Sequence, residues 1–464
     1  MSEETFDVIV IGAGPVGENA ADRAVKGGLS TALVERERFG GECSYWACIP
    51  SKALLRPGNA LAAARRLPGV PVGDALDPAA VFERRDYFTD KGDDGSQVEW
   101  ARGAGIETIR GRARITGERE ITVDGGRVLR ARHAVVVCTG SVPKTPPIPG
   151  LDEAPVWGSR EATASSTVPA RLAVVGGGVV GVEMAQAWAR LGARVDLIIT
   201  GPRPLPRYPD FAGDAVAEGL RADGVRVHTG SGLDRASTVD GSARLELTGG
   251  EVVTADQVLV ATGRRPATDD LGLEVIGLAP GKPLTVDDSG LVSEVDGEWL
   301  YAAGDVTGRA LLTHQGKYAA RIVGDVIAAR ATGKPVDTHP WGKHSSTADH
   351  HAVPQVVFTD PEVAAVGLTE PESGAPHRVV DIDIAVAGSS LHADGYAGKA
   401  RMIVDTERDV LVGVTFVGQD VAELLHSATV AVVGEVPLAR LWHAVPAFPT
   451  ISEVWLRLLE EYGL

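Results

Sequence analysis

Cysteine is scarce in this chain, which has only three cysteines among its 464 residues. So few cysteines exclude a small secreted scaffold held together by disulfides. No apolar run reaches the length of a membrane span, and residues 1–7 are acidic and lead straight into a predicted strand, unlike a signal peptide. We therefore expect a protein of the reducing cytoplasm, in which a disulfide is catalytic rather than structural.

Positive charge is also in short supply, because 45 Lys and Arg face 62 Asp and Glu and leave a formal net charge of −17. This balance argues against nucleic acid as a partner and disfavours nonspecific binding to anionic membranes. A chain of 464 residues exceeds one ordinary hydrophobic core, so we expect two to four domains. Aromatic residues make up only 5%, whereas the 56 glycines suit an α/β protein with many tight turns.

A glycine-rich turn stands near the N-terminus, where Gly12, Gly14 and Gly17 follow an apolar run and precede an Ala-rich one. The predicted elements are a strand over 6–11, a helix to about 27 and a strand over 29–35. With Glu35 about twenty positions further on, this unit matches the dinucleotide-binding fingerprint. Gly12 is expected to form the tight turn, Gly14 to admit the pyrophosphate, and Gly17 to pack helix on strand. The helix N-terminus attracts phosphate, and Glu35 can accept hydrogen bonds from ribose hydroxyls.

The same unit recurs with Gly176, Gly178 and Gly181. The predicted elements around it are a strand over 171–175, a helix over 182–191 and a strand over 194–199. Two short partner segments, 137–140 and 260–263, also repeat, so the chain is expected to hold two related nucleotide-binding domains. The Pro-rich residues 142–150 read as the linker between them.

The chain beyond the second unit has a different character. A strand over 301–303 ends in Gly304-Asp305, which can direct a carboxylate at a sugar hydroxyl. After about residue 340 the pattern predicts an α+β tail with antiparallel strands and no phosphate motif. The predicted elements of this tail are strands over 353–358, 400–404 and 410–416 and helices over 422–433 and 452–461.

Two of the three cysteines, Cys43 and Cys48, lie five positions apart just after the first glycine-rich unit. A thiol pair beside a dinucleotide site can exchange electrons with the cofactor, and a helix N-terminus or a cation favours the reactive thiolate. A structural disulfide closing so short a loop would constrain the unfolded chain little. A zinc site lacks a second ligand pair, so no metal is expected. A disulfide requires Cα atoms within about 7 Å, so the pair should straddle a distorted helix start, where Pro50 is tolerated.

Together these segments resemble the class I pyridine nucleotide-disulfide oxidoreductase family, which includes dihydrolipoamide dehydrogenase, glutathione reductase and mercuric reductase. The resemblance covers nearly the whole chain and is carried by residues 12–17, 43–52, 176–183, 261–266, 304–305, 311–314, 358–362 and 366–369. It implies an α/β fold with two Rossmann-like dinucleotide-binding domains plus a C-terminal α+β dimerisation domain. The expected domains are 1–150 (FAD-binding, first part), 151–268 (NAD(P)-binding), 269–340 (FAD-binding, second part) and 341–464 (dimerisation).

The resemblance further implies a homodimeric FAD enzyme whose partner's C-terminal segment completes the active site. Hydride would pass from NAD(P)H through flavin to a Cys43–Cys48 disulfide and on to a disulfide-type or other soft small-molecule acceptor. Cys48 would be the flavin-side thiolate and Cys43 the interchange thiol, and Lys52 and Glu183 resemble the ion pair beside the flavin. The alternatives are a solvated helix lysine for Lys52 and a helix-surface carboxylate for Glu183. The residues expected to bind the two cofactors are Gly12, Gly14, Gly17, Glu35, Gly41, Lys52, Thr139, Gly140, Gly176, Gly178, Gly181, Glu183, Arg203, Gly263, Gly304 and Asp305.

One departure from the family pattern affects proton transfer. The family's disulfide reductases usually carry His-Pro-Thr-x-x-Glu near the C-terminus, whereas this chain has Phe448 in place of the histidine and keeps Glu453. A phenyl ring cannot move a proton, and loss of a general acid–base group typically costs about 10²–10⁴ in rate. His443 is the nearest substitute in sequence, on the other side of Pro446, and core packing is the alternative reading of Phe448. Altered chemistry is the reading we favour.

Three other functions are consistent with these residues. The flavin could pass electrons directly to quinones or metal ions, with the cysteines dispensable. A carbon-centred reaction like that of the family's ketopropyl-coenzyme M carboxylase could use Phe448 to exclude protons, although that enzyme has histidine where this chain has Glu453. The third is a non-enzymatic redox-sensing scaffold.

The type of nicotinamide cofactor depends on the end of the second predicted strand of the repeat. No acidic residue stands in 199–203, which removes repulsion toward a 2′-phosphate, and Arg203 or Arg207 could bind it. Gly181 is more usual with NAD. We therefore lean slightly to NADPH and hold dual use open. Val179 stands where many relatives carry a tyrosine over the nicotinamide pocket, so we expect an open pocket.

Overall fold

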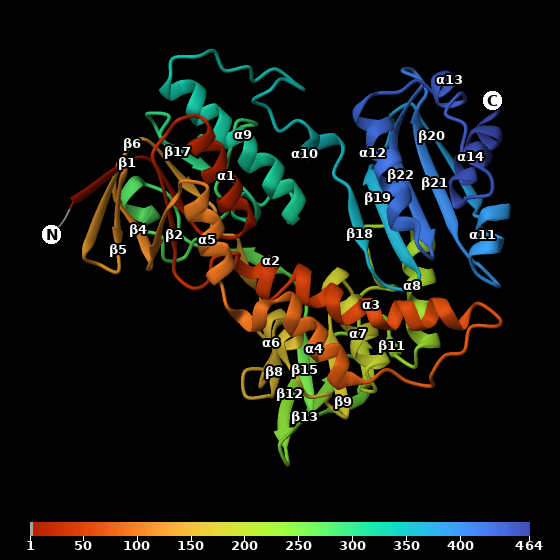
Figure 1. Cartoon of the computed structure of the whole chain (residues 1–464). Coiled ribbons are helices and arrows are strands. Elements are labelled where there is room, and N and C mark those ends of the chain that lie inside the picture. The colour runs from red at the N-terminus through yellow and green to blue at the C-terminus, as the bar shows by residue number, and fades with distance from the viewer. Residues whose placement is uncertain (1–2) are drawn as a thin grey trace. The chain divides into compact units, whose positions relative to one another are not determined.

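The computed structural model describes residues 3–464, so Met1 and Ser2 of the acidic N-terminal segment lie outside the described residues (Figure 1). The chain forms two compact units, each built from three separate stretches of sequence. The first comprises Met1–Ile49, Asp86–Lys144 and Arg264–His350, and the second comprises Pro50–Arg85, Thr145–Gly263 and His351–Leu464. Three helices run across the limits of these units: α3 (Cys48–Arg65), α4 (Pro78–Phe88) and α10 (Ala348–His351).

The first unit is built on a sheet of order β3-β2-β1-β6-β5-β4, with β17 also paired to β6. The pairs β3–β2, β2–β1, β1–β6 and β6–β17 are parallel, and β4, β5 and β6 form an antiparallel meander. Its strands are β1 (Glu3–Ile11), β2 (Thr31–Glu35), β3 (Glu107–Arg110), β4 (Ala113–Gly117), β5 (Glu120–Val123), β6 (Arg127–Val137) and β17 (Leu300–Ala302). Its helices are α1 (Pro15–Lys26), α2 (Gly41–Tyr45), α5 (Gly95–Gly103) and α9 (Thr313–Ala331), with 3-10 turns at Asp90–Gly92, Leu273–Ile276 and Asp305–Thr307.

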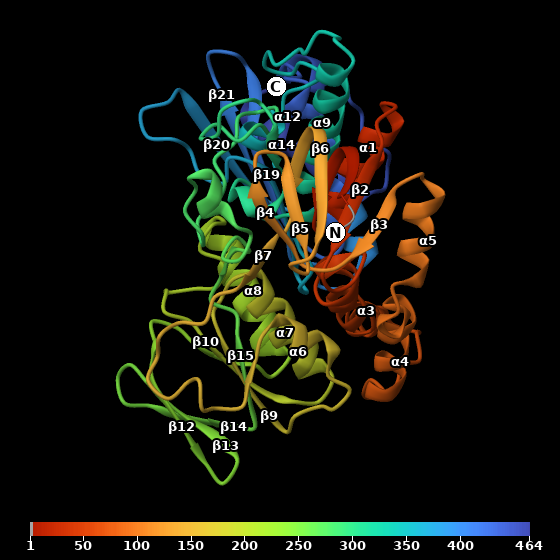
Figure 2. The same cartoon turned by 90° about the vertical axis from the view of Figure 1, so that its left-hand side faces the viewer.

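Helices α1 and α9 lie side by side in this unit, as Figures 1 and 2 show. Small residues make the close approach possible. A Cβ built on Gly324 of α9 would lie 2.5 Å from the Cβ of Arg23 and 2.8 Å from the carbonyl oxygen of Ala20, both on α1. The buried face of α1 joins one hydrophobic core with β1, β6 and α9. This packing therefore fixes the start of α9 relative to the glycine loop that opens α1.

The second unit contains a parallel sheet of order β11-β10-β9-β15-β8 and a three-stranded antiparallel sheet, β12-β13-β14, that projects below it in Figure 2. The strands are β8 (Val156–Trp157), β9 (Arg171–Val175), β10 (Arg194–Ile198), β11 (Arg226–His228), β12 (Leu233–Val239), β13 (Ser242–Leu247), β14 (Val252–Ala255) and β15 (Gln257–Val260). The helices are α6 (Ser159–Ala164), α7 (Val179–Arg190) and α8 (Asp210–Ala222). Buried side chains of α3, α4, α7 and α8 share a core with β9 and β10.

The C-terminal part of the second unit is an antiparallel sheet of order β18-β19-β22-β21-β20, against which α12 and α14 pack (Figure 1). Its strands are β18 (Gln355–Val357), β19 (Glu362–Gly367), β20 (His377–Asp383), β21 (Lys399–Asp405) and β22 (Val410–Gly418). Its helices are α11 (Ala387–His392), α12 (Leu425–Val433), α13 (Leu438–Leu441) and α14 (Val454–Tyr462), with 3-10 turns at Val421–Leu424 and Ile451–Glu453. The antiparallel tail is confirmed, and β19 and β20 are strands that the sequence pattern did not predict.

Two sequence-based expectations need correction. The predicted linker over 142–150 is in part a strand, because β7 (Ser141–Pro143) pairs antiparallel with β16 (Arg264–Pro266) where the chain leaves and re-enters the first unit. Helix α7 begins at Val179 rather than 182, since the second glycine loop leads directly into the helix. Within residues 3–464, no helix has both the length and the apolar character needed to cross a bilayer.

Candidate active site

The first glycine loop forms the turn that its sequence predicts. Gly12 has φ +98°, and a Cβ there would lie 2.5 Å from the carbonyl oxygen of Cys138. A Cβ on Gly17 would lie 1.8 Å from the carbonyl oxygen of Gly12, so only glycine permits this close packing. A Cβ on Gly14 would have its nearest neighbour at 4.0 Å, which leaves the start of α1 open for phosphate oxygens.

The carboxylate of Glu35 closes this loop at the end of β2. It accepts hydrogen bonds from the backbone amides of Ala13 at 2.8 Å and Glu37 at 2.7 Å. Burial raises the pKa of Glu35, and these two amides oppose the rise. Glu35 therefore orients the loop itself, in addition to the ribose contact that the sequence predicts for it.

The second glycine loop repeats this geometry in the second unit. Gly176 has φ +115°, a Cβ on Gly181 would lie 1.9 Å from the carbonyl oxygen of Gly176, and a Cβ on Gly178 would meet nothing within 4 Å. Beyond β10, the guanidinium of Arg203 forms ion pairs with Asp210 at 2.7 Å and Asp214 at 3.0 Å. These carboxylates already balance the charge that we expected to bind a 2′-phosphate.

The two cysteines converge on one point beside the first glycine loop. Cys43 lies in the short helix α2 and Cys48 is the first residue of α3, so the helical path breaks between them as the spacing predicts. Both are thiols, and a hydrogen bond joins Cys43 to Cys48. A Cβ on Gly41, at the start of α2, would lie 2.8 Å from the Cα of Gly14. The dithiol segment therefore abuts the open end of the dinucleotide loop.

The start of α9 completes the surroundings of the sulfurs. The hydroxyl oxygen of Thr313 lies 3.3 Å from the Cys48 sulfur, and the same hydroxyl also hydrogen-bonds Cys43. The hydrogen bond with Cys48, followed by burial, raises the pKa of Cys43, and Thr313 and the Lys317 ammonium oppose that rise. The pKa of the Cys43 thiol therefore lies above its usual range. Residue 313 lay within a segment that carried the family resemblance, but nothing in its sequence context indicated a contact with sulfur.

A buried carboxyl group lies near the same cluster. Glu18, in the first turn of α1, is 8% exposed, and its Oε1 has no hydrogen-bond partner within residues 3–464. Burial raises the pKa of Glu18 to about 7, and the Lys317 ammonium opposes the rise. Lys317 therefore acts on both Glu18 and Cys43, and its charge lowers the pKa of each group. Sequence reasoning missed Glu18, although an acidic residue directly after the third glycine was visible.

Lys52 and Glu183 form the ion pair that the resemblance predicts, and it lies in the second unit. Lys52 Nζ is 2.7 Å from Glu183 Oε2, and the Phe358 backbone amide donates to Glu183 Oε1 at 3.0 Å. The Lys52 ammonium also lies 4.9 Å from the centre of the Phe358 ring, a cation–π contact. Glu183 is only 3% exposed, which excludes the alternative of a helix-surface carboxylate.

Asp305 is held in place from the neighbouring strand. The hydroxyl of Ser141 donates to Asp305 Oδ2 at 2.6 Å, and Arg264 donates to the same hydroxyl at 2.7 Å. The backbone around the remaining predicted cofactor residues is in the region that favours glycine, with φ +70° at Gly140, +129° at Gly263 and +81° at Gly304. The Thr139 hydroxyl donates a hydrogen bond to the carbonyl of Ala267 at 2.9 Å, so this hydroxyl already has a partner within the protein.

The C-terminal residues that depart from the family pattern differ sharply in burial. Phe448 is 75% exposed, so the alternative that it is a core residue is wrong for this chain. Glu453 is 8% exposed, and its Oε2 has no hydrogen-bond partner among residues 3–464. His443 is exposed after α13, and its backbone amide bonds the carbonyl of Arg440. Over the same described residues, no group of three or more His, Cys, Asp or Glu side chains is arranged to hold a metal ion.

The geometry fits a flavin dinucleotide in the first unit. An uncovered helix start at Gly14, an acidic residue at the end of β2 and a fixed Asp305 carboxylate are the donors and acceptors that a pyrophosphate and its sugars require. The second unit offers the equivalent open loop for a second dinucleotide.

Comparisons with known proteins agree with this reading. Residues 6–333 match the family described as pyridine nucleotide-disulphide oxidoreductase, and residues 353–458 match the dimerisation domain of that family. The dihydrolipoyl dehydrogenase 2 of Haloarcula marismortui is 32% identical over 467 residues, covering 96% of this chain and 94% of the relative. The dihydrolipoyl dehydrogenase 3 of Pseudomonas aeruginosa is 34% identical over 447 residues, covering 92% and 91%.

A solved structure shares the whole fold. The HOCl-induced flavoprotein disulfide reductase RclA from Escherichia coli superposes with a TM-score of 0.83 at 26% identity, covering 98% of this chain and 99% of that one. The same reductase has been solved as a Cu(II) complex, which matches with a TM-score of 0.84 at 25% identity over 99% of both chains.

The chain belongs to the pyridine nucleotide-disulphide oxidoreductase family. It is accordingly an NAD(P)H- and FAD-dependent disulfide oxidoreductase, and it carries the family's dimerisation domain. The predicted fold class, two Rossmann-like domains followed by an α+β dimerisation domain, is confirmed.

Proposed function

We propose that Cys43 and Cys48 are the redox-active pair of this oxidoreductase, with Cys48 on the flavin side and Cys43 as the interchange thiol. The observation that carries the proposal is the convergence of both sulfurs on the hydroxyl of Thr313, beside the Gly14 loop. A helix N-terminus favours negative charge, and Cys48 opens α3, whereas Cys43 retains its proton.

The two sulfurs account for the chemistry without a further reactant. When bound, FAD would supply the electron pair of NAD(P)H, and the Cys43–Cys48 disulfide would take it up as one thiol and one thiolate. Cys43 then gives up its proton and attacks a substrate disulfide as a thiolate, which forms a mixed disulfide, while one substrate sulfur takes a proton and leaves as a thiol. Cys48 attacks Cys43, restores the internal disulfide and releases the second thiol. In sum, NAD(P)H, one proton and one disulfide give NAD(P)⁺ and two thiols.

Anaerobic stopped-flow reduction tests this proposal. One equivalent of NADPH should produce a long-wavelength thiolate-to-flavin band, and Cys48→Ser should abolish it while Cys138→Ser, at a buried thiol outside the pair, should keep it. A wild-type enzyme that shows only flavin bleaching would rule out the dithiol route.

The remaining cofactor contacts follow the family pattern in this proposal. Lys52, held by Glu183, places a positive charge for the reduced flavin, and Asp305 binds a sugar hydroxyl. In this proposal the cofactor-binding residues are those predicted from the sequence. The FAD-binding, NAD(P)-binding and dimerisation domains are divided after residues 150, 268 and 340, as the sequence predicts. NADPH is the preferred nicotinamide, supported by the absence of an acidic residue at 199–203. The ion pairs of Arg203 weaken this preference and leave Arg207 as the second candidate cation.

A metal ion is the second candidate acceptor, favoured by one specific observation. The structural relative RclA has been solved as a Cu(II) complex, both in its native form and as a C43S mutant. On this chain, the reduced Cys43–Cys48 pair, one thiol and one thiolate, would give one electron to each of two Cu(II) ions, releasing two Cu(I), one proton and the disulfide. Cu(II)-dependent NADPH oxidation that survives Cys43→Ala would instead assign the electrons directly to the flavin.

The active enzyme is a homodimer in this proposal, and a partner's C-terminal segment completes the site. Exposed apolar side chains in the dimerisation domain support this assembly. They include Val430, Trp442, Val445 and Phe448. Phe448 in place of the family's histidine would slow proton delivery to the leaving thiol. The low cysteine content supports a reducing, cytoplasmic setting.

A further inference from the structure

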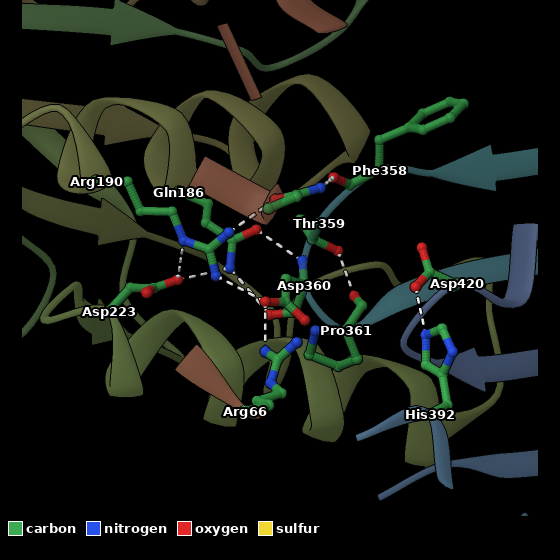
Figure 3. A network of polar contacts seen from close by, with 11 residues as sticks. Arg66, Gln186, Arg190, Asp223, Phe358, Thr359, Asp360, Pro361, His392 and Asp420 are labelled. Carbon is green, nitrogen blue, oxygen red and sulfur yellow. Dashed lines mark hydrogen bonds and ion pairs between the residues drawn. The ribbon is translucent and has the colours of Figure 1, made fainter. Parts of the chain in front are cut away.

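The family's pattern includes Glu183 but does not explain what holds it. Figure 3 shows a polar network at the segment that precedes β19, in which Asp360 lies between two arginines and the side chain of Gln186. Asp360 is 7% exposed. Burying a carboxylate costs free energy unless the carboxylate is fully hydrogen-bonded. The partners of Asp360 therefore show what this network does in the fold.

The side chain of Gln186 hydrogen-bonds both the backbone amide and the backbone carbonyl of Asp360. Its Oε1 accepts from the Asp360 amide at 2.8 Å, and its Nε2 donates to the Asp360 carbonyl at 2.9 Å. A single side chain thus makes the two bonds that a neighbouring strand would make. A Cβ on Gly219 would lie 2.5 Å from the same carbonyl oxygen, so this backbone has little room to move.

The carboxylate of Asp360 is bound from helix α7 and from the turn that follows helix α3. Arg190 of α7 donates to Oδ2 at 2.9 Å and Arg66 donates to it at 2.5 Å. Arg190 also donates to the Asn59 side chain at 2.7 Å, and Asn59 donates to the carbonyl of Phe358 at 3.2 Å. The segment from Phe358 to Asp360 is therefore held at its start and at its end.

The spacing along α7 connects this network to Glu183. Gln186 and Arg190 follow Glu183 by three and seven positions, which places all three side chains on one face of the helix. The same face thus presents Glu183 to the Phe358 amide and holds Asp360 two residues further along. Any movement of the segment relative to α7 would separate that amide from the Glu183 carboxylate.

We propose that Asp360 is a positioning residue, which holds the Phe358 amide against Glu183 and so fixes the Lys52 ammonium. The proposal rests on the proposed function, in which Lys52 acts on the flavin. Without the Asp360 charge, the two arginines lose their common partner and the segment is released. The Glu183 carboxylate then rotates, and Lys52 loses a fixed position.

The test is anaerobic stopped-flow reduction of FAD-loaded Asp360→Asn by NADPH. We expect the limiting rate of flavin reduction to fall about tenfold, equal to about 1.4 kcal/mol in barrier, with the nicotinamide Kd within about twofold of wild type. The thiolate-to-flavin band produced by dithiothreitol should keep its intensity, because it depends on Cys48 rather than on Glu183. A limiting rate equal to wild type in folded, FAD-loaded Asp360→Asn would overturn the proposal.

Two further variants keep the test decisive. If Asp360→Asn fails to fold, Arg66→Met removes one arginine and should lower the limiting rate in the same direction by a smaller factor; an unchanged rate overturns the proposal. Arg226→Met is the matched control, since it breaks an ion pair to buried Asp196 in the same unit without a link to Glu183. It should leave the limiting rate at the wild-type value, and an equal loss there would show that only general stability matters.

Failure of the underlying function is distinguishable. A wild-type enzyme whose flavin is not reduced by NADPH or NADH would refute the proposed function itself. If NADPH reduces the flavin of wild type and of Lys52→Met equally fast, the role of the ion pair is refuted, and with it the positioning role of Asp360.

Discussion

The hydroxyl oxygen of Thr313 and the sulfur of Cys48 lie 3.3 Å apart although the two residues are separated by 265 positions in the chain. The contact brings the first residue of α9 to the first residue of α3. Because the same hydroxyl also bonds Cys43, one side chain without a charge of its own contacts both sulfurs. Thr313 is therefore expected to influence how the dithiol shares its proton.

Replacing Thr313 with valine should make Cys43 harder to deprotonate, because the hydroxyl lowers the pKa of that thiol. A hydrogen bond to a charged group is worth roughly 1.5–3 kcal/mol, so alkylation of Cys43 by iodoacetamide should slow about tenfold near neutral pH. The measurement is the alkylation rate of the reduced enzyme against pH. Thr332→Val, at the opposite end of the same helix, is the control. Equal rates for Thr313→Val and wild type would contradict the assignment.

Replacing Phe448 with histidine should restore an acid–base group at the position where the family's disulfide reductases usually carry one. Turnover with lipoamide or glutathione disulfide should rise at least tenfold, within the factor of about 10²–10⁴ that such groups supply. Stability should change little, because the side chain is largely exposed. Steady-state kinetics of Phe448→His and Phe448→Leu would decide this. A rise in both variants would point to the size of the side chain, and no rise in either would show that proton transfer is not limiting.

The partly buried carboxyl of Glu362 in β19 should make stability depend on pH. Burial, with smaller effects from Asp420 and Asp360, raises its pKa from 4.5 to about 7. Below about pH 4.5 both the folded and the unfolded chain hold the proton. As pH rises to about 7 only the folded chain still holds it, so stability falls across this window, by on the order of 3 kcal/mol for this group.

Glu362→Gln removes that titration and keeps a group able to accept from the Ala422 amide, which donates to Glu362 at 2.9 Å. The loss of unfolding free energy between pH 5 and pH 7.5 should therefore be smaller in the variant than in wild type. Urea unfolding of the FAD-loaded enzyme at both pH values measures it. Parallel losses in the two proteins would show that Glu362 is ionised in the fold.

Neutralising Asp214 should shift cofactor use toward NADPH. Asp214 is one of two carboxylates that pair with Arg203, and its removal releases part of that guanidinium for a 2′-phosphate. Because an exposed ion pair is weak, kcat/KM for NADPH should rise only about threefold relative to NADH. Glu218→Gln, exposed on the same helix, is the control. A wild-type enzyme that clearly prefers NADH would refute the proposed preference.

Placing a charge at Val445 should break the proposed homodimer. Val445 is 83% exposed in the dimerisation domain, and a glutamate there would have to be desolvated in an interface. Light scattering should show Val445→Glu as a monomer that retains FAD but has lost disulfide reduction. Val239→Glu, at an exposed valine of β12, should remain dimeric. A wild-type enzyme that is active as a monomer would disprove the assembly.

The local parts of this protein could be predicted from sequence. The glycine loops, the broken helix between Cys43 and Cys48 and the antiparallel tail depend on short-range sterics and on the spacing of apolar residues. Strands β19 and β20 were missed because their short runs are interrupted by polar and small residues, and pairing with β22 and β21 supplies what local propensity does not.

The sequence by itself determined that this chain holds two dinucleotide loops and a thiol pair beside the first, since glycine and cysteine spacing restricts the backbone locally. Only the tertiary structure decided that Thr313 meets the sulfurs, that Asp360 is held beside the Glu183 segment and that Arg203 is already paired. These contacts join residues from different elements. They arise when polar groups find partners as each unit folds, and no local pattern in the chain records that outcome.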